Sequence, residues 1–330
     1  MAFPYQRKRI NRASHATREL MAENHLTVND FIVPLFIMPG ENKKEEIHAM
    51  PDYYRFSLDL VLEEIQELWN LGLKAVLLFV MVEEHEKDNT GVSAANPNGL
   101  MQKSIKAIKS RFPDLLVMTD VALDPYSSFG HDGIVEEGKI VNDKTSKALV
   151  NMAISHIKAG ADWVAPSDMM DGRIAAIRQA FNEKGWEDKG ILAYTAKYAS
   201  NLYGPFRIAL DSAPGFGDKK SYQMDFRNSK EALHEAELDI VEGADMIMVK
   251  PGSWYLDVVK DLSNHSNIPV SAYQVSGEYA MIKTAANAGF LNYRESMLES
   301  LYAFKRAGAQ VILSYFAKEV AELIQQGEHV

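Results

Sequence analysis

Two lysines stand at the ends of short apolar stretches of this chain, Lys197 in AYTAKYAS and Lys250 in MIMVKPGS. An isolated lysine has a pKa of about 10.4, so it is protonated at neutral pH and does not act as a nucleophile. Burial and a second cation nearby both favour the neutral amine, which can attack a carbonyl. The pair therefore favours an enzyme that forms Schiff bases, and two lysines suit two carbonyl substrates. The alternative is that each lysine only pairs with a carboxylate.

The elements that must position these lysines are short apolar runs separated by helical patterns. Each run has the continuous hydrophobicity of a parallel strand that is covered on both faces. Between the first two runs, Leu58, Leu62, Ile65 and Trp69 recur at helical spacing, and Gly72 follows where a helix would end. The eight runs end at Met38, Val80, Thr119, Pro166, Thr195, Val249, Tyr273 and Tyr315. This alternation predicts a (β/α)8 TIM barrel over residues 31–330, preceded by an extended N-terminal arm of residues 1–30.

In such a barrel the C-terminal ends of the strands form the active-site face. Adjacent strands lie about 4.8 Å apart, so Lys197 and Lys250, on the fifth and sixth strands, would face one cavity. Other polar side chains at or just after strand ends are Asp120, Ser167, Asp168, Gln274, Ser276, Ser314 and Tyr315. We expect these groups to converge on the same rim.

The composition excludes several classes of protein. The chain has 330 residues and a formal net charge of -10, which argues against general nucleic-acid binding. No apolar run approaches the roughly 20 residues of a membrane span, and no signal-peptide core follows the basic N-terminus. We therefore expect a cytoplasmic protein with no membrane partner. The absence of cysteine excludes disulfides, zinc–thiolate sites, iron–sulfur clusters and a cysteine nucleophile.

Several motifs give the chain a family resemblance. They are APSDMMDGR, LYGPFR, KKSYQM, MVKPG with YLD after it, YQVSGEYAM, and RAGA followed by SYFA. From about Phe31 to Ala321 the sequence resembles, in the same order, the porphobilinogen synthase family, also called 5-aminolevulinate dehydratase. The resemblance implies a lyase that condenses two molecules of 5-aminolevulinate to porphobilinogen with loss of two waters. That reaction is an early step in the biosynthesis of tetrapyrroles such as heme and chlorophyll.

The resemblance also implies roles for individual residues. Lys250 would form the Schiff base with the substrate that becomes the propionate side of the product, and Lys197 would engage the acetate-side substrate. The residues implied to bind the propionate-side carboxylate are Ser276 and Tyr315, and those for the acetate side are Arg207, Lys219 and Gln223. Residues Tyr203 to Gln223 are interpreted as a mobile lid, with Tyr203 among the substrate-binding groups. Asp120 could orient an amine or move a proton, and Ser167 could donate a hydrogen bond to a substrate; the alternative for both is strand-end capping.

The segment DVALDPYSSFGHDG departs from the pattern of the zinc-dependent members of that family. Three cysteines of those members are replaced here by Ala122, Asp124 and Asp132. We therefore expect no active-site zinc, because carboxylates and water favour harder cations such as Mg²⁺. Two alternatives stay open for Asp124 and Asp132: they hold a cation or water network, or they act alone and offset the lysines. His131, beside Asp132, is a weaker candidate for a ligand or proton carrier.

The resemblance places an activating Mg²⁺ site away from the catalytic centre. Glu235 in EALHEAE matches its carboxylate ligand, and Asp171 in SDMMDG matches an outer contributor. The alternative is that Glu235 is an exposed helical carboxylate. Mg²⁺ usually keeps several waters, so a single protein ligand would suffice. Binding of Mg²⁺ near the arm could also bias assembly allosterically.

The basic N-terminal arm has two interpretations, a solvated tail or a segment that packs on a neighbouring subunit. The resemblance favours the second, with a homo-octamer as the assembly, and Phe3, Pro4, Tyr5 and Ile10 would supply apolar contacts. Two other functions compete with the dehydratase. One is another Schiff-base barrel enzyme such as a class I aldolase, and the other is a barrel that binds a metabolite without turnover.

Overall fold

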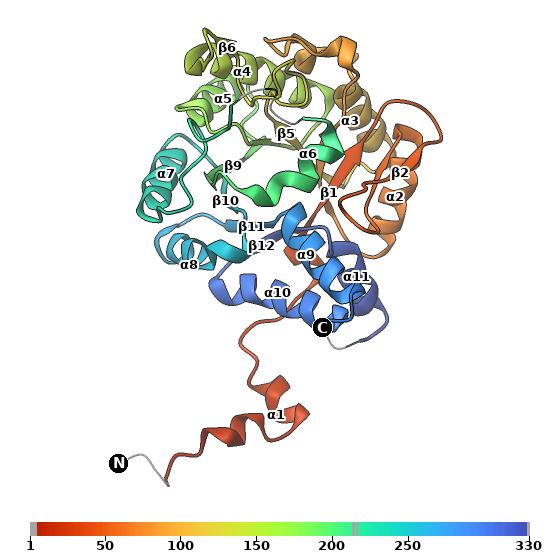
Figure 1. Ribbon diagram of the computed structural model, residues 1–330, viewed down its shortest axis with the longest axis vertical. Helices are drawn as coiled ribbons and strands as arrows, with labels where there is room; N and C mark the ends of the chain where they lie inside the picture. Colours follow the sequence, from red (N-terminus) through yellow and green to blue (C-terminus); the bar gives the residue numbers. More distant parts are fainter. Residues whose placement is uncertain (1–4, 213–214, 216, 329–330) are drawn as a thin grey trace.

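The structure is a computed structural model that describes residues 5–212, 215 and 217–328. Its centre is a closed barrel of parallel strands, which Figure 1 shows surrounded by helices. Phe31 pairs with Ile312 and so joins the last strand to the first. The barrel strands are β1 (Phe31–Ile37), β4 (Ala75–Val80), β5 (Leu116–Val121), β8 (Trp163–Pro166), β9 (Gly190–Lys197), β10 (Met246–Lys250), β11 (Val270–Gln274) and β12 (Val311–Ser314). The predicted (β/α)8 barrel is confirmed.

The helices cover the outside of the barrel through their apolar faces. The predicted helix between the first two strands is α2, but its buried residues are Val61, Ile65 and Leu68. Of the predicted face only Ile65 is fully buried, and Leu58, Leu62 and Trp69 are partly exposed, so the buried face is rotated from the predicted one. Helix α4 ends at Gly160, whose φ of 112° lies in the left-handed region that glycine adopts without a steric penalty. The helices are α1 (His15–Leu20), α2 (Leu58–Asn70), α3 (Leu100–Arg111), α4 (Asn142–Ala159), α5 (Arg173–Asn182), α6 (Gly204–Leu210), α7 (Lys230–Val241), α8 (Leu256–His265), α9 (Ser276–Asn287), α10 (Tyr293–Ala307) and α11 (Ala317–Gln325).

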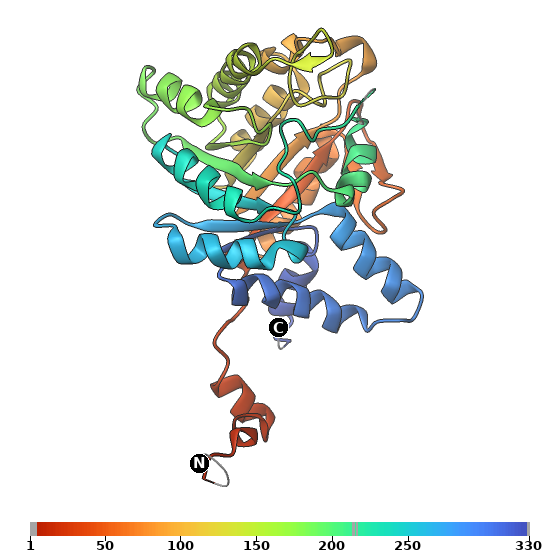
Figure 2. The same cartoon turned by 60° about the vertical axis from the view of Figure 1, so that its left-hand side comes forward.

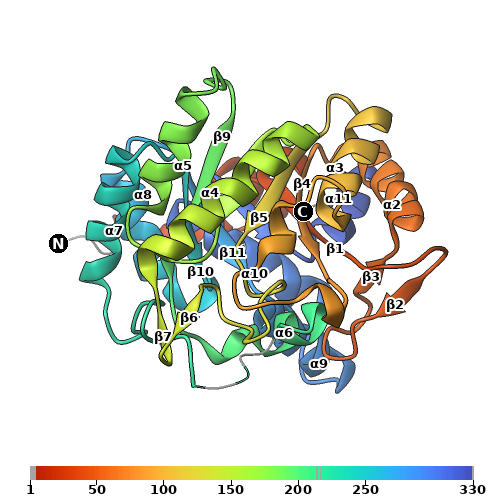
Figure 3. The same cartoon turned by 90° about the horizontal axis from the view of Figure 1, so that it is seen from above.

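Two short hairpins supplement the barrel. One hairpin joins β2 (Lys44–Glu46) to β3 (Tyr54–Phe56), and β3 pairs in parallel with the C-terminal end of β1. The other joins β6 (Val135–Glu136) to β7 (Lys139–Ile140). Figure 3 shows α6 and the β6–β7 hairpin together at the end of the barrel where the strands finish. These segments therefore cover the predicted active-site face.

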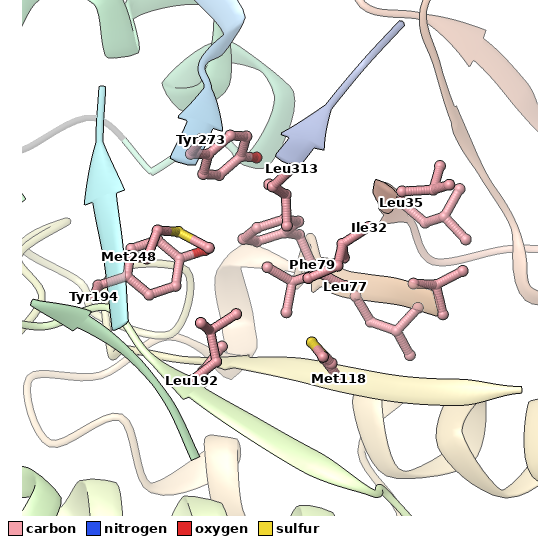
Figure 4. Close-up of a cluster of buried hydrophobic side chains, with 14 of the residues drawn as sticks. Ile32, Leu35, Leu77, Phe79, Met118, Leu192, Tyr194, Met248, Tyr273 and Leu313 are labelled. Carbon is pink, nitrogen blue, oxygen red and sulfur yellow. The ribbon is translucent and has the colours of Figure 1, made fainter. Parts of the chain in front are cut away.

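The barrel interior is filled by large apolar side chains. Figure 4 shows Leu77, Met118, Leu192 and Met248, from four different strands, pointing toward one another. All four are no more than 1% exposed, so this part of the barrel is a packed core rather than a pore. The chemistry must therefore take place above this layer, at the C-terminal ends of the strands.

A bulge in β9 changes which of its residues face the interior. Ala193 pairs with Ile247 of β10, but Ala196 pairs with Val249, so β9 contains one residue more than β10 over this stretch. Strict alternation from the inward Tyr194 would place Lys197 on the outer face. Because the extra residue reverses the alternation, Lys197 points inward and pairs in register with Lys250. The predicted fifth strand ended at Thr195. That boundary is wrong, because β9 continues to Lys197.

Figures 1 and 2 show α1 set apart from the barrel and joined to it by an extended segment. The described residues of this arm are mostly exposed, including Tyr5 and Ile10. Phe3 and Pro4, which were expected to contribute apolar contacts, lie outside the described residues. Packing of the arm on a neighbouring subunit stays a prediction. Within the described ranges, no helix combines the length and the apolar character needed to cross a membrane.

Candidate active site

Lys250 is the last residue of β10, and its amine lies among aromatic rings. The Nζ atom is 4.7 to 5.2 Å from four ring centroids, and the side chain is only 5% exposed. The rings belong to Tyr273, Phe206, Tyr194 and Tyr203. Burial, followed by the charge of Lys197, lowers the pKa of Lys250 to about 7. A substantial fraction of this amine is therefore neutral at physiological pH, as attack on a ketone requires.

Lys197 has a different environment from its neighbour. Its amine donates a hydrogen bond to the carbonyl of Ser167 and lies 3.7 Å from Oδ2 of Asp132. The side chain is as buried as that of Lys250, but a carboxylate offsets its charge. The two amines thus share one cavity but differ in their surroundings, because Lys197 has an ionic partner and Lys250 has aromatic faces.

Lys219 reaches the same cavity from the segment that follows α6. Its Nζ atom lies 3.1 Å from Oδ1 of Asp132 and 3.5 Å from Oδ2 of Asp124. Burial alone would lower the pKa of Lys219, but the charges of Asp124 and Asp132 outweigh it and raise that pKa. Burial likewise opposes ionisation of Asp132, yet Lys197 and Lys219 hold the pKa of this carboxyl well below its usual range. Gln223 adds a hydrogen bond from Nε2 to Asp132 at 3.4 Å.

Asp120 is the carboxyl group best suited to proton transfer. Burial and the charge of Asp124 raise the pKa of Asp120 to about 7, and the charges of Lys250 and Lys197 oppose this shift. Its Oδ1 atom is buried and has no hydrogen-bond partner among the described residues. A carboxyl and an amine that both titrate near neutrality can exchange a proton at little cost, so Asp120 and Lys250 form a candidate acid–base pair. Burial also raises the pKa of Asp124.

The start of the predicted lid is attached to the strand ends. The hydroxyl of Tyr203 donates to the carbonyl of Tyr198 at 2.6 Å and lies 3.0 Å from the carbonyl of Lys250. Tyr203 therefore presents its ring, rather than its hydroxyl, to the Lys250 amine. At the other end of α6, the carbonyls of Ala209 and Asp211 accept from Nη1 of Arg55 at 3.2 Å and from Nζ of Lys87 at 3.1 Å. The predicted lid also includes residues 213–214 and 216, which lie outside the described residues.

The predicted propionate-side residues lie behind the lid. The Ser276 hydroxyl accepts a hydrogen bond from the backbone N–H of Phe206 at 3.0 Å. The Tyr315 hydroxyl is 2.8 Å from that of Tyr273. Both predicted residues are at most 3% exposed. In this conformation a substrate carboxylate must displace the lid backbone to reach Ser276.

The structure brings most of the predicted residues to one small cavity of about 20 Å³. That volume holds about one water molecule, so the cavity in this conformation is too small for substrate. The predicted residues that line it are Asp120, Asp124, Asp132, Ser167, Lys197, Tyr203, Arg207, Lys219, Gln223 and Lys250. Ser276 and Tyr315 do not line this cavity, whereas Glu235 and Asp171 line a separate one of about 810 Å³. His131 also lines the larger cavity, where its Nδ1 lies 3.1 Å from the Tyr222 hydroxyl.

The two candidate cation sites differ in how well their residues suit a metal. Within the described part of the chain, no group of three or more His, Cys, Asp or Glu side chains is arranged to hold an ion. Asp124 and Asp132 already have Lys219 between them, so their charge is satisfied by an amine. Burial raises the pKa of the half-buried Glu235; the charge of Arg173 opposes this, and the charges of Asp239 and Asp171 add to it. A partly buried carboxylate oxygen with other carboxylates nearby suits Mg²⁺.

Three aromatic residues of the site were not predicted from the sequence. Tyr194, Tyr273 and Phe206 surround Lys250, yet the first two had been interpreted only as strand residues. Simple alternation places Tyr194 and Lys197 on opposite faces, and only the bulge in β9 brings them to one side. Phe206 was visible in the LYGPFR motif, where its position beside Arg207 was the available signal.

The chain is similar to proteins of one family over nearly its whole length. The sequence profile described as delta-aminolevulinic acid dehydratase matches residues 5–323. A delta-aminolevulinic acid dehydratase of Bradyrhizobium diazoefficiens is 50% identical over 97% of this chain and 91% of its own length. One from Methanothermus sociabilis is 48% identical over 98% of this chain and 100% of its own length.

A solved structure agrees with these relatives. It is the delta-aminolevulinic acid dehydratase (porphobilinogen synthase) of Toxoplasma gondii ME49 in complex with the reaction product porphobilinogen. The two structures superpose with a TM-score of 0.94 at 49% sequence identity, over 96% of this chain and 91% of the other. The likeness therefore covers both the sequence and the fold.

Proposed function

The chain belongs to the delta-aminolevulinic acid dehydratase family, and from that premise we propose that Lys250 and Lys197 are the two amines that capture its substrates. The enzyme is a hydro-lyase of tetrapyrrole biosynthesis that condenses two molecules of 5-aminolevulinate to porphobilinogen. The observation that carries the assignment is the register of β9 and β10, in which Lys197 pairs opposite Lys250 and both line one small cavity.

Lys250 attacks the ketone carbon of one 5-aminolevulinate as the neutral amine. The addition gives a carbinolamine, whose hydroxyl takes a proton from an acid and leaves as water, and the nitrogen lone pair then forms the iminium. Asp120, whose pKa lies near that of Lys250, supplies and removes the protons of these steps. The iminium withdraws electrons from the adjacent carbon, so that carbon can lose a proton and form a bond to the second substrate. The aromatic rings around Lys250 exclude water that would hydrolyse the imine.

Lys197 engages the second substrate, and the groups around it bind that substrate's carboxylate. Arg207 offers a planar fork for two charge-assisted hydrogen bonds, and Lys219 offers a point charge. Gln223 can donate an amide N–H from the same segment. Ser276 and Tyr315 bind the carboxylate of the first substrate with hydroxyl donors once the lid backbone has moved away. Ser167 lines the same cavity as Lys197 and Lys250 and can act as a further donor.

The carboxylates of Asp124 and Asp132 act without a metal in this proposal. Lys219 and Lys197 contact them directly, and these ion pairs support the alternative in which the aspartates offset the lysines. Mg²⁺ instead binds at Glu235, with Asp171 as an outer contributor, and supplies charge stabilisation there rather than catalysis. A thermal-melt comparison tests this site: Mg²⁺ should raise the melting temperature of the wild type, and Glu235→Gln should abolish that rise.

The arm of residues 1–30 mediates association into a homo-octamer in this proposal. Its exposed apolar residues Tyr5 and Ile10, and its separation from the barrel, support a role in subunit contacts. Light scattering of the full chain and of a chain lacking residues 1–25 tests it. The full chain should form the octamer and the shortened chain a smaller species.

One experiment tests the catalytic assignment directly. The protein is incubated with 5-aminolevulinate, reduced with borohydride and digested, and the modified lysine is mapped by mass spectrometry while pyrrole formation is assayed. The proposal expects an adduct on Lys250 together with pyrrole. Pyrrole formation by Lys250→Met at the wild-type rate would refute the role of Lys250. An adduct without pyrrole would support a different Schiff-base enzyme.

A further inference from the structure

Glu278 is a buried carboxylate that the reaction does not use. It lies in the first turn of α9, two residues after Ser276, and is 1% exposed. Its Oε2 atom accepts a hydrogen bond from the backbone N–H of Val275 at 2.7 Å. Its Oε1 atom accepts one from the backbone N–H of Ser253 at 2.6 Å. One side chain thus joins the loop after β10 to the loop after β11.

Ordinary helix capping explains only half of this arrangement. A glutamate at the third helical position commonly reaches back to the N–H that precedes the helix, as Glu278 does to Val275. Capping gives no reason for the second bond, which crosses to Ser253 on the neighbouring strand's loop. The second bond therefore requires a different explanation.

The carboxylate is also costly at this position. Burial raises the pKa of Glu278 to about 7 even though backbone N–H groups favour its charged form. An ionised carboxylate has acceptors only, so it can satisfy two N–H donors at once. A glutamine of the same shape offers one acceptor and presents an NH₂ group to the other donor. The geometry therefore selects a carboxylate despite its burial.

The two loops carry the two groups that must hold the first substrate. Ser253 is three residues after Lys250, and Val275 directly precedes Ser276. The loop after β10 fits closely against its surroundings. A Cβ on Gly252 would lie 2.4 Å from the Phe304 ring. The two bonds from Glu278 then hold the loop after β11 at a set distance from this packed loop.

We propose that Glu278 is a positioning residue that sets the separation between the Lys250 amine and the Ser276 hydroxyl, so that one keto acid can span both. The proposal rests on the proposed function, in which Lys250 binds the ketone and Ser276 binds the carboxylate of the same molecule. Glu278 itself touches neither the substrate nor the reacting atoms. It acts through the backbone N–H groups of Ser253 and Val275.

Two ketones of the same chain length separate positioning from mere support of the fold. The compound 4-oxopentanoate has the ketone and the carboxylate of the substrate, whereas 2-pentanone has the ketone alone. Only the first can use Lys250 and Ser276 together. The amount of adduct trapped on Lys250 by cyanoborohydride is measured by mass spectrometry against the concentration of each ketone, in wild type, Glu278→Gln and Ser276→Ala.

The proposal expects Glu278→Gln to raise the half-saturating concentration of 4-oxopentanoate by about tenfold and to leave that of 2-pentanone unchanged. Ser276→Ala should show the same selectivity. The same loss for both ketones in Glu278→Gln would mean that Glu278 only supports the strand end, and no loss for either would mean that it positions nothing; each result overturns the proposal. Absence of any Lys250 adduct in the wild type would instead overturn the proposed function.

Asp245→Asn is the matched control. Asp245 precedes the opposite end of β10, where its Oδ2 accepts from the backbone N–H of Ile191 at 2.8 Å and pairs with Arg178. The substitution removes a backbone-binding carboxylate from the same strand, but far from the catalytic rim. Its trapping curves should match those of the wild type for both ketones. A selective loss of 4-oxopentanoate binding in Asp245→Asn would show that any weakening of β10 gives this signature, and would overturn the assignment to Glu278.

Discussion

Removal of the charge on Lys197 should raise the pKa of Lys250. At a separation equal to the strand spacing of about 4.8 Å, two unit charges in an effective dielectric of 20 repel by about 3.5 kcal/mol. That repulsion corresponds to about 2.5 pKa units. Asp132 lies 3.7 Å from the Lys197 amine and offsets part of it, so a net change of about 1 to 2 units is expected. Lys197→Met removes the cation, and it also frees Asp132 to stabilise protonated Lys250, which acts in the same direction.

The change is measured as the pH dependence of adduct formation on Lys250. The protein is mixed with 4-oxopentanoate and cyanoborohydride over a pH series, and the initial rate of labelling at Lys250 is determined by mass spectrometry. The midpoint in the wild type should fall near pH 7. In Lys197→Met it should move upward by about 1 to 2 pH units. Labelling at pH 7 should therefore slow by about 5- to 50-fold.

Two further variants separate the electrostatic effect from other causes. Lys197→Arg keeps the positive charge but cannot form a Schiff base, so its midpoint should stay near that of the wild type. Lys109→Met removes a cation at the other end of the barrel, where Lys109 pairs with Asp162 at 2.9 Å. This variant should leave the midpoint pH of Lys250 labelling unchanged. A Lys197→Met midpoint equal to that of the wild type, or below it, would refute the coupling between the two lysines. Burial among the aromatic rings would then account for the whole shift.

Three other substitutions have directions that the structure fixes. Arg207→Lys replaces a two-pronged donor by a point charge, so KM for 5-aminolevulinate should rise by about tenfold in steady-state assays, and an unchanged KM would remove Arg207 from carboxylate binding. Burial lowers the pKa of His156 from 6.5 to about 3, so the folded state loses stability as pH falls from 6.5 toward 3, by up to about 1.4 kcal/mol per pH unit. In urea unfolding at several pH values, His156→Gln should therefore show a shallower loss than the wild type; equal slopes would contradict the neutral, buried imidazole. Gly252→Ala places a Cβ 2.4 Å from Phe304 and should lower the unfolding free energy by about 1 to 3 kcal/mol, and a gain in stability would refute this packing.

The barrel could be predicted from the sequence because its signal is repeated. Each strand is a short apolar run with a helical pattern after it, and an error at one run leaves the pattern intact. Strand ends were less accurate for a physical reason. Asp120 lies inside β5 and Lys197 inside β9, although polar residues had been taken to follow those strands. At the rim of a barrel the residues that face the interior become polar. The apolar run of a strand therefore ends before its backbone hydrogen bonds to the neighbouring strands do.

Some residues of the candidate site could be predicted from the sequence and others could not. Lysines and aspartates at strand ends could be found because charged groups beside apolar runs are rare unless they have partners or a function. The aromatic surroundings of Lys250 could not, since Tyr194 and Tyr273 look like ordinary core residues in a strand. The positioning role proposed for Glu278 could not be predicted from the sequence either. Its second bond partner, Ser253, lies 25 residues earlier in the chain, and no local pattern connects the two.

The bulge in β9 and the charges above it together explain how one cavity can hold two lysines in different environments. The bulge supplies the geometry, because without the extra residue Lys197 would face the outer helices and Lys250 would have no cationic neighbour. The charged groups around the amines make the surroundings of Lys197 and Lys250 different. Asp132 contacts Lys197 and Lys219 but not Lys250, so the first two amines have ionic partners, while Lys250 meets ring faces and Asp120, whose pKa burial raises to about 7. A dication between Asp124 and Asp132 would compete with Lys219 for the same oxygen atoms. Under the proposed function, amines take the positions that a metal would occupy, and Lys250, which has the fewest ionic contacts among them, is the proposed nucleophile.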